Sequence, residues 1–187
     1  DRATSNICTA QALLASMAGM YAAYHGPEGL KRIATNIHSG AAYLASKLSE
    51  LGYALSHQHF FDTLHIQLPG RLHASDFKKL AEEKQLNFYY PTESTVQLST
   101  DETTREESLN GILEVFSLAV KKGIHFEETL EDKLAFDPSF ARSSSFLVQE
   151  TFHKYRSETA LMRYITRLER KDISLAQSMI SLGSCTM

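Results

Sequence analysis

The side chains best suited to hold a small ligand stand at the end of the sequence. In the final stretch, SLGSCTM, Gly183 precedes Ser184, Cys185 and Thr186. Glycine tolerates backbone conformations that other residues avoid, and the three side chains offer hydrogen bonds without bulk. We expect this stretch to form one wall of a binding pocket, and an ordinary turn is the alternative interpretation.

Small polar residues also precede the first helical pattern. Thr4, Ser5 and Asn6 stand where their side chains and the free N–H groups of a helix could hold an anion. The same residue types are the preferred caps of a helix. Capping is the simpler interpretation.

Three histidines lie close together in the sequence, at positions His57, His59 and His65. The spacing of the first two places both imidazoles on one face of a strand, as a metal site requires. No third ligand follows at a familiar spacing, and exposed histidines on strands are common. We therefore predict no metal site.

No lysine has the setting that covalent carbonyl chemistry needs. That chemistry uses an amine whose charge is suppressed by apolar surroundings, and every lysine here stands among polar residues. A glycine-rich phosphate loop and a G-x-S-x-G serine elbow are also absent from the sequence. The residues alone therefore predict no catalytic group.

Composition excludes several classes of protein. The 187 residues are 43% hydrophobic and 22% charged, which suits one substantial core with appendages. A formal charge of −3 with scattered basic residues does not suit nucleic-acid binding, and no apolar run approaches the roughly 20 residues of a membrane span. Two cysteines at opposite ends form no disulfide framework. We expect an intracellular protein that binds neither nucleic acid nor membrane.

Helical patterns fill the first 52 residues. Residues 5–24 are small or apolar nearly all round, which predicts a helix buried on several sides. Gly26 and Pro27 interrupt it, and proline suits the first position of a new helix. From residue 30 to residue 51 apolar side chains recur every three or four positions, and Gly52 can end the helix in a left-handed conformation.

A mixed region follows. Apolar and polar residues alternate over 61–68, which predicts a half-buried strand, and further strands and helices follow. Those further elements are a short helix over 72–85, strands over 86–90 and 94–99 separated by Pro91, and a helix over 101–122 with Gly123 beyond it. The fold class is therefore α/β, with a small mixed or antiparallel sheet covered by helices. Beyond it, residues 124–156 predict a long connector, and Ser157 is a candidate cap for a helix that continues to residue 172.

The sequence resembles a known family in four stretches: ATSNICTAQALLA, YHGPEGLKRIA, FFDTL and YRSETALMRYITRLERKDISLAQSMISLGSCTM. The family is glycine dehydrogenase (decarboxylating), the P-protein of the glycine cleavage system. Two departures are Arg156, where the family usually has histidine, and Ser181, where proline is usual. Because the chain begins at Asp1 rather than at methionine, we expect it to be an internal piece of such a protein.

The resemblance implies a domain organisation. P-proteins are built from two halves, each similar to a fold type I pyridoxal-phosphate enzyme. Residues 1–27 would be an interdomain helix, residues 28–123 the small C-terminal domain of the first half, and residues 124–187 the connector and the start of the second half.

The resemblance also implies an activity for the parent protein. It would decarboxylate glycine on pyridoxal phosphate and transfer the aminomethyl group to the lipoyl arm of H-protein. Ser184, Cys185 and Thr186 would line the cofactor pocket, and the Schiff-base lysine would lie outside this chain. The partners would be lipoylated H-protein and the rest of the P-protein, in a homodimer or heterotetramer, in the bacterial cytoplasm or in mitochondria. The alternative function is a non-catalytic interaction or ligand-binding module.

Overall fold

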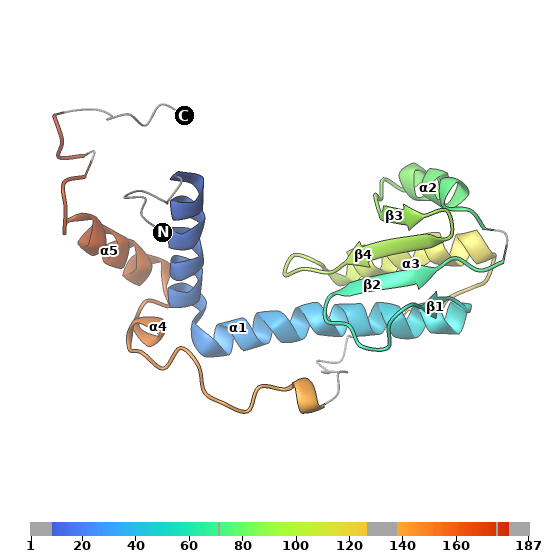
Figure 1. Cartoon of the computed structure of the whole chain (residues 1–187), viewed down its shortest axis with the longest axis horizontal. Helices are drawn as coiled ribbons and strands as arrows, with labels where there is room; N and C mark the ends of the chain where they lie inside the picture. The colour runs from blue at the N-terminus through green and yellow to red at the C-terminus, as the bar shows by residue number, and fades with distance from the viewer. Residues whose placement is uncertain (1–8, 71, 127–137, 175, 180–187) are drawn as a thin grey trace, which may run out of the picture. The chain divides into compact units, whose positions relative to one another are not determined.

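The computed structural model describes residues 9–70, 72–126, 138–174 and 176–179. The chain divides into two compact units. Unit 1 combines residues 1–30 with residues 144–187, and unit 2 spans residues 31–143. Helices and one small antiparallel sheet make up the described residues, which confirms the predicted fold class (Figure 1).

Unit 2 is built on a four-stranded sheet in which all neighbouring strands are antiparallel. The strand order is β1-β2-β4-β3. The strands are β1 (Ala54–Leu55), β2 (Thr63–Gln67), β3 (Tyr89–Thr92) and β4 (Thr95–Ser99). In β2 the buried residues are Leu64 and Ile66, as the alternating pattern predicts.

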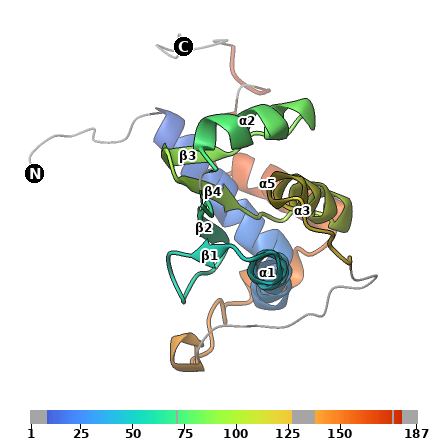
Figure 2. The same cartoon turned by 90° about the vertical axis from the view of Figure 1, so that its right-hand side faces the viewer.

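Helices cover one face of this sheet. The later part of α1 (Thr9–Leu51) and α3 (Glu106–Val120) lie on the same side of the strands, and α2 (Ala74–Glu83) packs with α3 (Figure 2). Together they enclose a core of fully buried side chains. The largest are Phe77, Phe116, Leu44, Leu48, Leu64, Ile66, Leu109 and Leu113.

Helix α1 is interrupted at Gly26, where φ is 61° and ψ is −178°. That conformation is open essentially to glycine alone, and Pro27 follows it. The second helical segment ends at Leu51, and Gly52 follows with φ of 97°. Both the interruption and the left-handed stop are therefore confirmed.

Two boundaries of predicted elements are wrong for local reasons. Pro91 does not separate two strands but lies inside β3, which is an edge strand where a missing N–H costs little. Helix α3 begins at Glu106 rather than near Asp101, because the Asp101 carboxylate accepts hydrogen bonds from Thr103 and Thr104 in a turn. At the other end of α3, Lys121 adopts the left-handed conformation, two residues before Gly123.

Unit 1 contains two further helices in the region predicted to be a connector and a helix. Helix α4 (Thr151–Lys154) is short, and α5 (Glu158–Glu169) follows it. The Ser157 hydroxyl accepts a hydrogen bond from the Ala160 N–H over 3.3 Å, which confirms the predicted cap. A 3-10 helix, η1 (Pro138–Phe140), belongs to unit 2.

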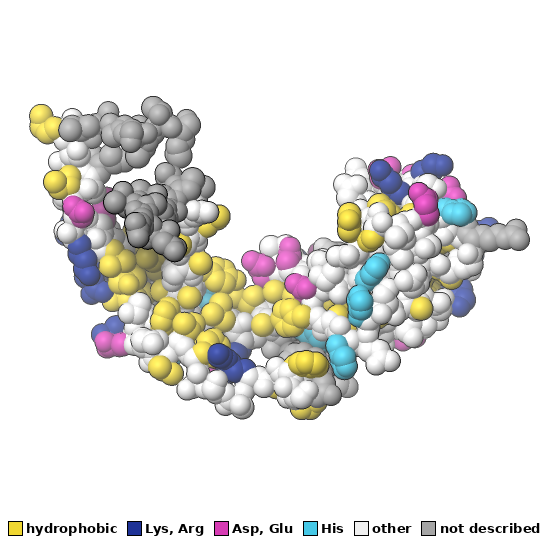
Figure 3. Space-filling model, viewed as in Figure 1, with side chains coloured by type: hydrophobic (Ala, Val, Ile, Leu, Met, Phe, Trp, Pro, Cys, Tyr) yellow, Lys and Arg dark blue, Asp and Glu magenta, His cyan; other side chains and the backbone are white. Residues whose placement is uncertain are grey.

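The first segment of α1 exposes its apolar side chains. Leu13, Leu14 and Met17 are about 60% exposed, at 62%, 63% and 58%. Figure 3 shows hydrophobic side chains, in yellow, at the surface of unit 1. The prediction that this helix is buried on several sides is wrong for the described residues of this chain. No other described segment covers the face that carries Leu13, Leu14 and Met17. Among the described helices, none is both long and apolar enough to cross a bilayer.

Candidate functional site

The predicted pocket wall cannot be placed by the structure. Ser184, Cys185 and Thr186 lie outside the described residues, and so do Thr4, Ser5 and Asn6. Their roles remain predictions.

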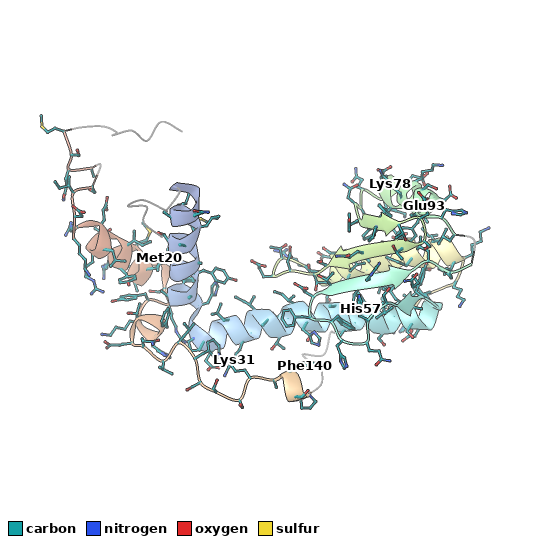
Figure 4. All side chains as sticks on the ribbon, in the orientation of Figure 1. Met20, Lys31, His57, Lys78, Glu93 and Phe140 are labelled. Atoms are coloured by element: carbon teal, nitrogen blue, oxygen red, sulfur yellow. The ribbon has the colours of Figure 1, made fainter. Side chains whose placement is uncertain are left out.

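The three histidines of unit 2 do not converge on one point. The ring centroids of His57 and His65 lie 5.9 Å apart, whereas His59 packs edge-on against Phe140 at 5.5 Å. Figure 4 labels His57 and Phe140. In the described ranges, no group of three metal-binding side chains is arranged to hold an ion. Aromatic packing is therefore the role that the structure supports for His59.

A fourth histidine, His38, is fully buried in α1. Its Nδ1 donates to the backbone oxygen of Phe61 over 2.8 Å, and its ring stacks on the Phe61 ring at a centroid distance of 5.7 Å. This contact joins α1 to the segment that leads into β2. In the sequence, His38 stands three residues before Ala41, on the same side of the helix as the apolar residues. That spacing was the available indication that His38 is buried.

The described lysines lie at the surface or beside a carboxylate. All are exposed except Lys47, and the Lys47 Nζ lies 3.4 Å from both carboxylate oxygens of Glu50. Lys78, on the surface of α2, pairs with Glu82 (Figure 4). Covalent carbonyl chemistry uses a lysine amine in apolar surroundings, and no lysine in the described ranges has that setting.

Gly26 is the point where α1 meets α4 in unit 1. A Cβ atom on Gly26 would lie 2.5 Å from the backbone oxygen of Phe152 and would also touch the Arg156 guanidinium. Arg156 itself donates to the Phe152 oxygen over 3.2 Å and lies 3.3 Å from the Nδ1 of His153. Arg156 thus closes the end of α4 at this junction.

An aromatic pair joins the end of α4 to α5. The rings of Tyr155 and Tyr164 stack at a centroid distance of 4.0 Å with planes 8° apart. The Arg167 guanidinium lies 5.5 Å and 5.3 Å from the two ring centroids, and it donates to the Tyr155 hydroxyl. The spacing of Tyr164 and Arg167, three residues apart on a helix, was the available signal.

Ionisable groups with shifted pKa values lie in unit 2. Burial raises the pKa of the Tyr53 hydroxyl, which donates to the Phe116 backbone oxygen over 2.8 Å. Burial, and then the charge of Glu82, raises the pKa of Tyr90. Hydrogen bonds from Thr103, and then from Thr104, lower the pKa of Asp101. In the described residues, none of these three groups forms a nucleophile–base pair.

Several proteins similar to this chain are named glycine dehydrogenase (decarboxylating). The chain is 50% identical over its whole length to glycine dehydrogenase (decarboxylating) of Christiangramia forsetii and 48% identical to that of Bacteroides thetaiotaomicron. It is 44% identical to the mitochondrial glycine dehydrogenase (decarboxylating) of Mus musculus, again over the whole chain. The alignments cover 19%, 20% and 18% of these relatives, so the chain spans about a fifth of their length.

A family comparison gives the same result. Residues 1–116 match the glycine cleavage system P-protein family, and this match includes α1, α2, all four strands and most of α3. The chain therefore belongs to the glycine cleavage system P-protein family.

Proposed function

We propose that this chain is part of a glycine dehydrogenase (decarboxylating) that releases carbon dioxide from glycine and transfers the aminomethyl group to lipoylated H-protein. The observation that carries the proposal is the identity of 44% to 50% from end to end with relatives of that name. Those relatives include bacterial proteins and a mitochondrial one. The parent would work in the bacterial cytoplasm or in mitochondria.

Pyridoxal phosphate is the cofactor proposed for the parent. The described lysines do not fit its attachment, because they are exposed or paired with carboxylates. As the family resemblance implies, we assign the covalent step to a lysine outside this chain. Within the chain, Ser184, Cys185 and Thr186 are proposed as the wall of the cofactor pocket.

The structure supports a scaffolding role for the remaining residues. Unit 2 encloses its own core, as expected for the small domain of a larger enzyme. The exposed apolar residues of α1 need a cover that the described residues do not supply. The rest of the parent protein would supply it. The ranges 1–27, 28–123 and 124–187 remain the proposed parts of the P-protein halves.

Carbon dioxide release from carboxyl-labelled glycine tests the proposal. The full-length protein with lipoylated H-protein should release the label, and the 187-residue chain alone should not. Borohydride treatment of the chain with pyridoxal phosphate should fix no unique lysine. Release by the chain alone, or a single fixed lysine, would contradict the assignment of the covalent step.

A substitution in the full-length protein tests the pocket wall. Ser184→Leu should lower glycine turnover at least about tenfold, the scale of one lost positioning contact, while thermal stability stays unchanged. Ser145→Leu is the matched control, because Ser145 is exposed in unit 1. Equal turnover in the two variants would remove this stretch from the pocket.

A further inference from the structure

Three arginines share one face of α5. Arg163, Arg167 and Arg170 follow an i, i+4, i+7 spacing, which places them within roughly 60° of one another around the helix axis. Glu158 and Glu169 lie roughly 100° or more away from that face. Figure 3 shows the Lys and Arg side chains of this part of unit 1 in dark blue.

These arginines have no carboxylate partner in the part of the chain that the structure describes. The ion pairs there involve other residues, including the nearby pair Lys154–Glu150. Like charges three or four residues apart destabilise a helix. The three arginines therefore destabilise α5 by mutual repulsion, and an anion bound to this face would reduce that repulsion.

Two adjoining surface cavities of about 390 and 460 Å³ lie along the face. Both are lined by Arg163 and Arg167. Lys154, Tyr155 and Tyr164 contribute to the first cavity, and Arg170 contributes to the second. A small ligand in either cavity would lie beside the side chains of both Arg163 and Arg167.

One of the arginines is already held in position. Arg167 lies over the stacked rings of Tyr155 and Tyr164 and donates to the Tyr155 hydroxyl. A side chain restrained in this way loses less conformational freedom when it binds a ligand. Arg163, one turn earlier, faces the same cavities and is exposed.

We propose that this arginine face of α5 binds the phosphate group of a small molecule. Guanidinium groups present paired N–H donors that match phosphate oxygens, and a phosphate dianion balances more of the three positive charges than one carboxylate does. The proposal does not rest on the proposed pocket at residues 184–186 or on the proposed enzyme activity. Free phosphate and a phosphate monoester are the two sources of this chemistry.

Titration of the 187-residue chain tests the proposal. Inorganic phosphate and phenyl phosphate are added at low ionic strength, and binding is followed by calorimetry and by the NMR signals of the arginine side chains. Arg163→Gln and Arg170→Gln should each weaken binding about tenfold, the scale of a lost charge-assisted hydrogen bond. Arg105→Gln is the matched control, because Arg105 is an exposed arginine of unit 2 before α3. Circular dichroism establishes that each variant is folded.

The outcomes separate the alternatives. Equal affinity for both probes identifies phosphate itself as the ligand group, and tighter binding of phenyl phosphate identifies an aromatic monoester; both support the proposal. It is overturned if neither probe binds, or if Arg105→Gln weakens binding as much as Arg163→Gln. Tighter binding of a poly-glutamate peptide than of either probe also overturns it, in favour of an acidic protein partner.

Discussion

Replacing Gly26 by alanine should loosen unit 1 while leaving unit 2 unchanged. Gly26 holds φ of 61° and ψ of −178° in the interruption of α1. It also approaches the backbone oxygen of Phe152 in α4 so closely that a Cβ atom would lie 2.5 Å from it. Alanine is therefore disfavoured both by its own backbone conformation and by its neighbour.

The expected loss of stability has two contributions, the backbone conformation at Gly26 and the contact with the Phe152 oxygen. A non-glycine residue in this backbone region costs about 1–3 kcal/mol. The Arg156 side chain can rotate away from the new methyl group, but the Phe152 oxygen belongs to the backbone and moves only if α4 moves. We expect a total of at least about 2 kcal/mol, which corresponds to an opening equilibrium about 30-fold more favourable.

Hydrogen exchange measured on separate peptides is the appropriate assay, because two compact units need not unfold together. Protection in residues 9–25 and 151–154 should fall about 30-fold, and protection in β2 and β4 should not change. Gly19→Ala is the matched control, because Gly19 lies in the same helix with no neighbouring atom within 4 Å of a new Cβ. It should raise stability by about 0.5–1 kcal/mol. Unchanged protection in Gly26→Ala, or equal losses in both variants, would refute the reasoning.

Three further predictions concern a buried hydrogen bond, an exposed apolar surface and a carboxylate. Tyr53→Phe removes the buried hydrogen bond to Phe116 and should lower the urea-derived unfolding free energy of unit 2 by about 1 kcal/mol; no change would mean that this contact adds no stability. The chain should self-associate in sedimentation experiments, and the double variant Leu14→Glu, Met17→Glu should shift it toward monomer; a monomeric wild type at high concentration contradicts this. Hydrogen bonds lower the pKa of the Asp101 carboxyl, so its charged form stabilises the fold above the ordinary pKa of 3.8, and this stabilisation is lost as the pH falls below that value. Asp101→Asn should therefore flatten the acid dependence of stability below about pH 4. An unchanged acid profile would show that the turn contributes nothing through this carboxylate.

The elements that local chemistry controls were predictable. The cap at Ser157 depends on a hydroxyl and an N–H three residues later. The stop at Gly52 depends on glycine alone, and the buried residues of β2 follow the two-residue period of a strand. The start of α3 was predicted too early because the Asp101 carboxylate accepts a hydrogen bond from the Thr103 N–H. This bond stabilises a turn where the helix was expected to begin.

The candidate site was less predictable. The pocket wall at residues 184–186 is still a prediction, since it lies outside the described residues. The stack of Tyr155 on Tyr164 depends on how α4 meets α5, which no local pattern encodes. The arginine spacing on α5 was visible in the sequence, but the cavities beside it were not.

The sequence by itself predicted the long helices, a small sheet covered by helices, and the family, because residue periodicity, capping side chains and shared residues are properties of the chain order. Tertiary structure alone decided that Pro91 sits in an edge strand, that His38 is buried against Phe61, and that the apolar residues of α1 remain exposed. The physical reason is that burial and pairing depend on which surfaces meet. The residue pattern of one helix shows that a surface is apolar, but whether another surface covers it depends on the fold.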